Sequence, residues 1–188
     1  TCALPILVEK KGIYSIENFL TARRLMYWQV YLHKTSVAAE KMLINVLTRA
    51  SLLASEAGQL FCSPALGYFL SGHITGEMFR EHPACLDTFV QLDDNDIWCA
   101  LKVWGSHPDT ILSTLSRGLT DRRLFKVQMA SEPFADADLR QLSADIAATL
   151  AIPPADAARY MLSHTTLQKD MYSAHDDQIE ILYPDGTV

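Results

Sequence analysis

The sequence has few of the features on which several protein classes depend. No run approaches the roughly 20 apolar residues that span a bilayer, and the opening residues lack the basic leader of a secretory signal. The cysteines are few, far apart and without a CxxC pair: Cys2, Cys62, Cys85 and Cys99. That spacing is typical of reduced thiols and excludes a zinc knuckle or a disulfide framework. We therefore expect a cytoplasmic protein with no membrane partner.

The motifs of several common enzyme classes are also missing. The sequence contains no Gly-rich phosphate loop, no GxSxG elbow and no Cys/His nucleophile constellation. A net charge of −6 argues against a surface that coats nucleic acid, although it does not exclude a small basic pocket for a nucleotide. With 188 residues and 49% hydrophobic content, the chain is able to bury a core of ordinary size.

Hydrophobic periodicity and capping residues predict a mainly helical chain. Helix signals follow one another along most of the sequence, and Pro153-Pro154 interrupts the last long one. The expected helices are 13–33, 37–56, 64–70, 76–80, 84–92, 96–104, one from His107-Pro108 to about 117, and 136–150, with a short helix or extended piece at 155–161.

Three segments alternate in the manner of strands: 4–8, 123–129 and 178–183. The last of these runs into the turn Pro184-Asp185-Gly186. The predicted fold class is therefore mainly α, with a helical bundle-like part followed by a small α+β part that contains a short antiparallel sheet.

The segment from Gly12 to Ala50 (GIYSIENFLTARRLMYWQVYLHKTSVAAEKMLINVLTRA) is the most informative one. At about 100° per residue, its first helix places Arg23 within an apolar stripe, between Phe19 and Tyr27. A guanidinium keeps its proton and is costly to bury without an anion. Either a carboxylate elsewhere in the protein pairs with Arg23, or the site accepts an anionic ligand such as phosphate.

The same segment resembles the block that follows the catalytic core in bacterial HD-domain phosphohydrolases, which are related to the SAM-and-HD-domain deoxynucleotide triphosphohydrolases. The matching residues are Arg23 and, eight positions later, Tyr31-Leu32-His33-Lys34, within the frame ENFLTARRLMYWQVYLHK. A second block, residues 92–127 (LDDNDIWCALKVWGSHPDTILSTLSRGLTDRRLFKV), resembles the next helical segment of that family. Animal members have a glutamine where Leu32 stands, which puts their base or sugar selectivity in doubt here.

The resemblance implies a dGTPase-like enzyme that removes phosphate, in particular triphosphate, from a deoxynucleotide and that forms homo-oligomers. In the family a divalent metal is held by histidines and aspartates upstream of this block. We therefore expect a fragment with no catalytic and no metal-binding residue of its own, inactive alone. Residues 1–120 would be the helical C-terminal portion of the HD core, and residues 121–188 a truncated α+β subdomain.

The resemblance also implies substrate-binding roles for Arg23, Tyr31, His33 and Lys34. The matching arginine contacts substrate phosphates, and the matching tyrosine borders the sugar and phosphate. Structural alternatives remain open: an interior ion pair for the arginine, core packing for the tyrosine, and favourable helix C-terminal charge for His33 and Lys34. Arg24, at the edge of the stripe, is a weaker candidate. The first helix is apolar almost all round, so we expect it to be central in the fold.

Three further patterns invite functional interpretations that we set aside. His175-Asp176 spells the name of the HD family, but it lies in a polar connection before a strand, and we expect no metal there. The run 93–96 (DDND) lacks the glycine and the distant glutamate of a calcium loop, so a helix cap is expected. A basic cluster comprises Arg117, Arg122, Arg123 and Lys126. It is either ordinary surface or a contact for an anionic effector or subunit.

A second hypothesis from another class is a non-catalytic oligomerisation or regulatory module. In this case the polar interior would serve packing only. Candidate contact residues are Trp28, Trp98 and Trp104, although core burial is the default for tryptophan.

Overall fold

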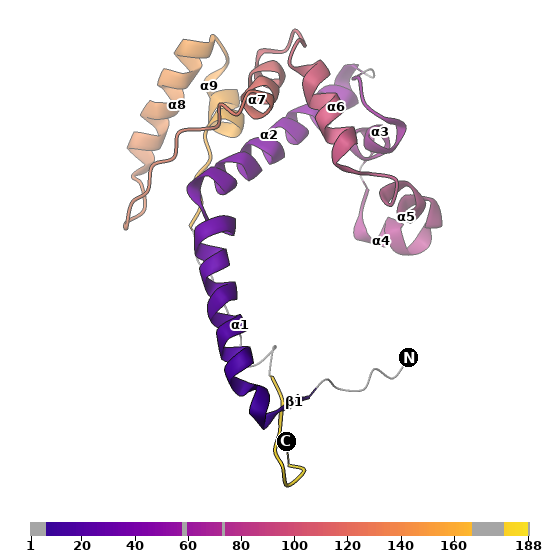
Figure 1. The fold of residues 1–188 in the computed structure, drawn as a ribbon. Helices are drawn as coiled ribbons and strands as arrows, with labels where there is room; N and C mark the ends of the chain where they lie inside the picture. Colours follow the sequence, from indigo (N-terminus) through magenta and orange to yellow (C-terminus); the bar gives the residue numbers. More distant parts are fainter. Residues whose placement is uncertain (1–6, 58–59, 73, 167–178, 188) are drawn as a thin grey trace. The chain divides into compact units, whose positions relative to one another are not determined.

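The computed structural model describes residues 7–57, 60–72, 74–166 and 179–187 (Figure 1). Within these residues the chain is mainly helical, as predicted. Its internal contacts divide it into two compact units. One comprises residues 1–36 and 165–188, and the other comprises residues 37–164. Residues 121–164 thus group with the helices before them, while the predicted domain division at residue 120 stays a prediction.

The first unit contains a long helical segment and a minimal sheet. Strand β1 (Val8–Glu9) leads through a 3-10 turn (Lys10–Gly12) into α1 (Ile13–Met26), which continues as a π-helical segment, Tyr27–Tyr31. Strand β2 (Ile181–Leu182) lies beside β1 (Figure 1). The register pairs Val8 with Ile181, and the Val8 N–H donates to the Glu180 carbonyl over 3.0 Å.

The sheet differs from the predicted one in two ways. Strands β1 and β2 are parallel, so the antiparallel prediction was wrong. No tight turn joins these strands, and the hairpin connection that would enforce antiparallel pairing is therefore absent between them. The predicted strand at 123–129 has no regular structure. Two consecutive residues of this segment, Leu124 and Phe125, are instead half-buried against the core, and the Phe125 N–H lies 3.2 Å from Met42 Sδ.

The second unit is built from helices that agree closely with the predicted ones. Helix α6 packs on α7, and α8 packs on a second π-helical segment, Ala157–Met161. The helix bounds are α2 (Lys34–Ala57, whose first residues belong to the first unit), α3 (Pro64–Ser71), α4 (Gly76–Glu81), α5 (Pro83–Phe89), α6 (Asp94–Trp104), α7 (Thr110–Thr120), α8 (Asp136–Leu150) and α9 (Pro154–Asp156).

The core of the second unit centres on Trp104. Its side chain is fully buried, and its Nε1–H donates to the Phe61 carbonyl over 2.8 Å. Around it gather apolar side chains from α2, α3, α6 and α7, among them Val46, Ala50, Leu66, Leu101, Leu112 and Leu115. Trp104 is thus a core residue, while Trp28 and Trp98 remain 52% and 47% exposed.

Local capping residues define where several helices begin. The Asp93 carboxylate accepts from the N–H groups of Asn95 and Asp96, and Asp96 Oδ2 accepts from the Asp93 N–H in a capping box. This confirms that the DDND run is a helix cap. Helix α7 begins at Thr110, after Asp109, and not at His107-Pro108 as predicted, because the Asp109 side chain caps the Leu112 N–H.

Helix α1 carries much exposed apolar surface in the described structure. None of its residues is buried, and it exposes Tyr14, Phe19 and Leu25. The central place expected from its apolar surface therefore stays a prediction. Apolar side chains all round a helix show that it has apolar surface to bury, but they do not identify the element that packs on it.

Candidate functional site

A hollow of about 370 Å³ lies on one face of α1 and the π-helical segment that follows it. We call it the α1 hollow. Its lining comes entirely from this continuous helical stretch: Phe19, Ala22, Arg23, Met26, Tyr27 and Tyr31. Side chains three or four positions apart share a helix face, which explains why these residues meet. Arg23 and Tyr31, eight positions apart, both line the hollow, as the helical spacing predicts.

Arg23 is an exposed cation in this mostly aromatic and aliphatic lining. Its guanidinium carbon lies 5.7 Å from the centroid of the Tyr27 ring. No carboxylate in the described part of the chain forms an ion pair with it. The described residues thus offer no support for the interior ion pair that was the structural alternative for Arg23.

The tyrosines of the hollow touch each other. The rings of Tyr27 and Tyr31 have centroids 5.1 Å apart and are tilted by 48°. Tyr27 is half-buried, whereas Tyr31 is 57% exposed. Tyr31 is thus available to a ligand, and core packing does not explain its position in the described structure. Its predicted role at the sugar and phosphate stays a prediction.

His33 and Lys34 do not line the hollow. His33 is exposed in the turn after the π-helical segment, where its Nδ1 accepts from the Thr35 N–H over 3.3 Å. Lys34 is the first residue of α2 and does not end the preceding helix, so the predicted C-terminal dipole contact is wrong for it. Arg24 is exposed on α1 outside the hollow.

The described residues contain no group of three or more His, Cys, Asp or Glu side chains that fits a metal ion. His175-Asp176 lies outside the described residues, and His164 is exposed. The basic cluster at 117–126 is exposed as well. Within it Arg123 lies 3.8 Å from Asp121, and Arg122 adopts a left-handed backbone conformation with φ of 58°.

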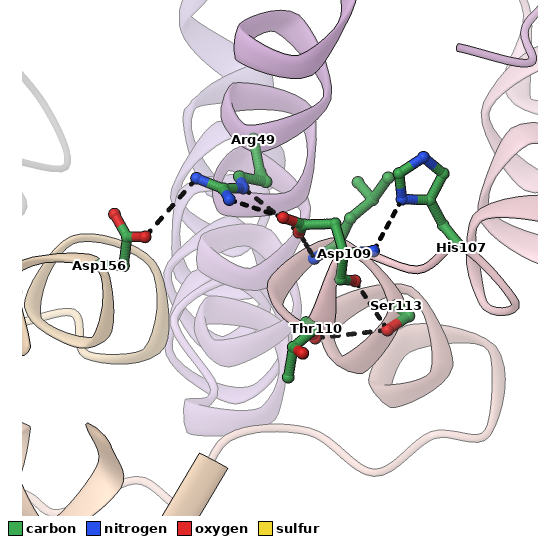
Figure 2. Close-up of polar contacts among 7 residues, drawn as sticks. Arg49, His107, Asp109, Thr110, Ser113 and Asp156 are labelled. Atoms are coloured by element: carbon green, nitrogen blue, oxygen red, sulfur yellow. Dashed lines mark hydrogen bonds and ion pairs between the residues drawn. The ribbon is translucent and has the colours of Figure 1, made fainter. Parts of the chain in front are cut away.

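An interior ion pair of the kind considered for Arg23 is formed instead by Arg49 and Asp109 (Figure 2). Arg49 Nη2 donates to Asp109 Oδ2 over 2.6 Å and Nε donates to Oδ1 over 3.3 Å. Arg49 Nη1 also lies 3.8 Å from Asp156 Oδ2, and its guanidinium carbon lies 5.4 Å from the Tyr160 ring centroid. This cluster joins α2, α7 and the α9 region of the second unit.

The pKa values within this pair reflect its geometry. The hydrogen bond to Asp109 raises the pKa of Arg49. For Asp109, burial raises the pKa, but the hydrogen bonds from Arg49 and the Leu112 N–H outweigh it, so the pKa is lowered. Sequence reasoning missed the pair. The only local signal was an aspartate directly before the Thr110-Ile111-Leu112 run, which is typical of an N-cap.

Parts of the chain are similar to known proteins. Residues 4–60, which include the whole α1 hollow, match a family described as the HD associated region. The chain is 31% identical over 123 residues to the uncharacterized protein YwfO of Bacillus subtilis, covering 64% of this chain and 26% of that protein.

A solved structure is also similar to nearly the whole chain. The crystal structure of a phosphohydrolase from Bacteroides thetaiotaomicron matches with 55% sequence identity and a TM-score of 0.87, over 96% of this chain and 45% of that one. The chain thus spans less than half the length of either relative. Together these similarities relate the chain to HD-domain proteins.

Proposed function

We propose that the intact protein is a metal-dependent HD-superfamily phosphohydrolase that hydrolyses deoxynucleoside triphosphates, and that the α1 hollow grips substrate phosphate and sugar. The observation that carries this proposal is Arg23, a cation in an aromatic hollow with no ion-pair partner among the described residues. The similarity to a phosphohydrolase and to the HD associated region supports it.

The chemistry of the hollow suits a nucleotide. Phosphoryl transfer depends largely on positioning and charge neutralisation, and a planar guanidinium binds phosphate oxygens through two parallel hydrogen bonds. The aromatic lining offers apolar surface to a sugar beside that cation. In this proposal Arg23 clamps the phosphates and Tyr31 supports the sugar. His33 and Lys34, outside the hollow, would meet only a more distant part of the substrate.

The described residues do not fit the divalent metal that the proposal requires. We propose, as the family resemblance implies, that residues of the intact protein outside this chain hold the metal. When bound, such a metal lowers the pKa of a water for attack on phosphorus. The part played by this chain is binding and orientation.

Turnover of deoxynucleoside triphosphates by the full-length protein with Mn²⁺ or Co²⁺ tests the proposal. Loss of the Arg23 contact should lower kcat/KM of Arg23→Ala by about 10- to 100-fold, since charge-assisted hydrogen bonds are worth about 1.5–3 kcal/mol. The matched control is Arg24→Ala, which removes a neighbouring arginine outside the hollow and should stay within about twofold. Equal activity of Arg23→Ala and the wild type would remove Arg23 from the site.

We also propose that the intact protein is a cytoplasmic homo-oligomer, as the resemblance implies. Exposed apolar side chains at the second unit support an assembly role, in particular Leu86, Phe89, Val90 and Trp98 on and between α5 and α6. No helix in the described ranges has both the length and the apolarity needed to cross a membrane. Light scattering on the full-length protein tests the assembly, and a strict monomer at micromolar concentration contradicts it.

A further inference from the structure

Tyr27 lies between Arg23 and Tyr31, two of the four residues for which the family resemblance implies substrate-binding roles. The guanidinium of Arg23 stands 5.7 Å from the centre of its ring, and the ring of Tyr31 stands 5.1 Å from it on the same helical stretch. All three line the α1 hollow. Tyr27 therefore contacts both of them, whereas the resemblance gave it no role.

Arg23, Tyr27 and Tyr31 differ in burial, and the difference suits the place of Tyr27 between the other two. Tyr27 is half-buried, while Arg23 and Tyr31 are exposed. An exposed arginine has many rotamers and loses that freedom when it binds a ligand. An aromatic ring that already restricts the guanidinium lowers the entropy still to be lost, which is the advantage of preorganisation.

An arginine side chain can be held by carboxylates or by an aromatic ring, and the molecule contains both arrangements. The guanidinium of Arg49 is held by the carboxylates of Asp109 and Asp156, which neutralise its charge. A ring orients a cation through its quadrupole and carries no net charge. Both arginines stay charged, but carboxylates already pair with Arg49, whereas Tyr27 does not compete with an anion for Arg23.

The backbone also places Tyr27. It opens the π-helical segment that Tyr31 closes, and the Leu32 N–H donates to the Tyr27 carbonyl over 2.7 Å. This bond spans five residues and is the defining bond of a π-helix. Single π-helical turns are frequent at functional sites. Here the turn contains both tyrosines of the hollow, so the Tyr27–Tyr31 contact and the local backbone are coupled.

We propose that Tyr27 is a positioning residue of the nucleotide site, whose ring holds the Arg23 guanidinium for phosphate and the Tyr31 ring for the sugar. The inference rests on the proposed function, because it needs a nucleotide at the hollow. We assign this role to the ring, since the contacts of Tyr27 with Arg23 and Tyr31 are made through it.

The test uses the full-length protein with Mn²⁺ and a deoxynucleoside triphosphate, comparing Tyr27→Phe with Tyr27→Leu. Tyr27→Phe keeps the ring and should retain KM within about twofold. Tyr27→Leu should raise KM by about 5- to 30-fold, with a smaller change in kcat, because the cation–π and ring–ring contacts are both lost. Competitive inhibition by inorganic triphosphate should weaken by a similar factor in Tyr27→Leu.

A double-mutant cycle adds a second measurement, whose result would not depend on Arg23 if Tyr27 had only a structural role. In an Arg23→Ala background Tyr27→Leu should cost less than in the wild type, because the contact it removes is already gone. Tyr27→Gln provides a second ring-free variant in case Tyr27→Leu loses its fold, as judged by circular dichroism.

The outcomes separate this inference from the function on which it rests. If Arg23→Ala lowers kcat/KM but Tyr27→Leu and Tyr27→Gln keep the wild-type KM, the positioning role is wrong and the proposed function stands. An equal defect in Tyr27→Phe and Tyr27→Leu also overturns the role of the ring. If Arg23→Ala itself has no effect, both the function assigned to the hollow and the role of Tyr27 fail.

Discussion

Arg49 and Asp109, sixty positions apart in the sequence, form a two-contact ion pair whose side chains are only 14% and 15% exposed (Figure 2). The same carboxylate caps α7 by accepting from the Leu112 N–H over 2.7 Å. One aspartate thus fixes the start of a buried helix and ties it to α2. An arginine held in this way is structural, whereas no such ion pair of Arg23 is found among the described residues.

Replacement of Arg49 by alanine should destabilise the protein clearly. The change leaves a largely buried Asp109 carboxylate without its cation, and we expect a loss of about 2 kcal/mol in the free energy of unfolding. Urea denaturation of Arg49→Ala and the wild type measures it. Arg123→Ala is the matched control, because its pair with Asp121 is 3.8 Å long and exposed, so its loss should be below about 0.5 kcal/mol. Equal losses in the two variants would contradict the role given to the Arg49 pair.

The lowered pKa of Asp109 predicts an acid-dependent loss of stability. The unfolded state, with an ordinary aspartate pKa of about 3.9, binds the proton more readily than the folded state does. The contribution of Asp109 is therefore fully present above about pH 4–5 and is lost as the pH falls through its folded pKa. Urea midpoints measured between pH 7 and pH 3 should fall less steeply for Asp109→Asn than for the wild type. A parallel fall in both proteins would show that other carboxylates govern the acid response.

Much of the helical layout was predictable because its signals are local. Helix α8 occupies the predicted residues, and α3 and α4 differ from theirs by a single residue at the end. Pro64, Gly105 and the Pro153-Pro154 pair mark starts and stops that depend on neighbouring residues only. The shared face of Arg23 and Tyr31 likewise follows from helix geometry alone.

The errors concern features that depend on distant partners. The strand predicted at 123–129 has an alternating sequence, but a strand forms only beside another one, and here the adjacent side chains of Leu124 and Phe125 pack on the helical core instead. The direction of the β1–β2 pair and the Arg49–Asp109 contact likewise depend on residues far away in the sequence. The contacts of Tyr27 were not predicted, because an aromatic residue at helical spacing usually indicates core packing.

The capping box at the start of α6 should contribute measurably to stability. Asp93→Ala removes the acceptor for the N–H groups of Asn95 and Asp96, and we expect the Tm to fall by about 2–4 °C. Asp94→Ala is the control, since it removes a neighbouring acidic side chain and leaves the cap in place. Differential scanning calorimetry measures both. A larger loss in Asp94→Ala would mean that charge near the helix start matters more than the cap.

Replacement of Arg23 by lysine separates charge from geometry at the α1 hollow. Both side chains carry one positive charge, but the ammonium of lysine is a point charge without a planar fork, and it is more strongly hydrated than a guanidinium. It binds phosphate through single hydrogen bonds and stacks less well on Tyr27. Arg23→Lys should therefore recover only part of the activity lost in Arg23→Ala, with kcat/KM of the full-length protein reduced by about 3- to 10-fold and always less than in Arg23→Ala. Arg24→Lys, outside the hollow, should match the wild type. Full activity in Arg23→Lys would show that a positive charge alone suffices, and the stacked guanidinium over Tyr27 would then have no part in binding.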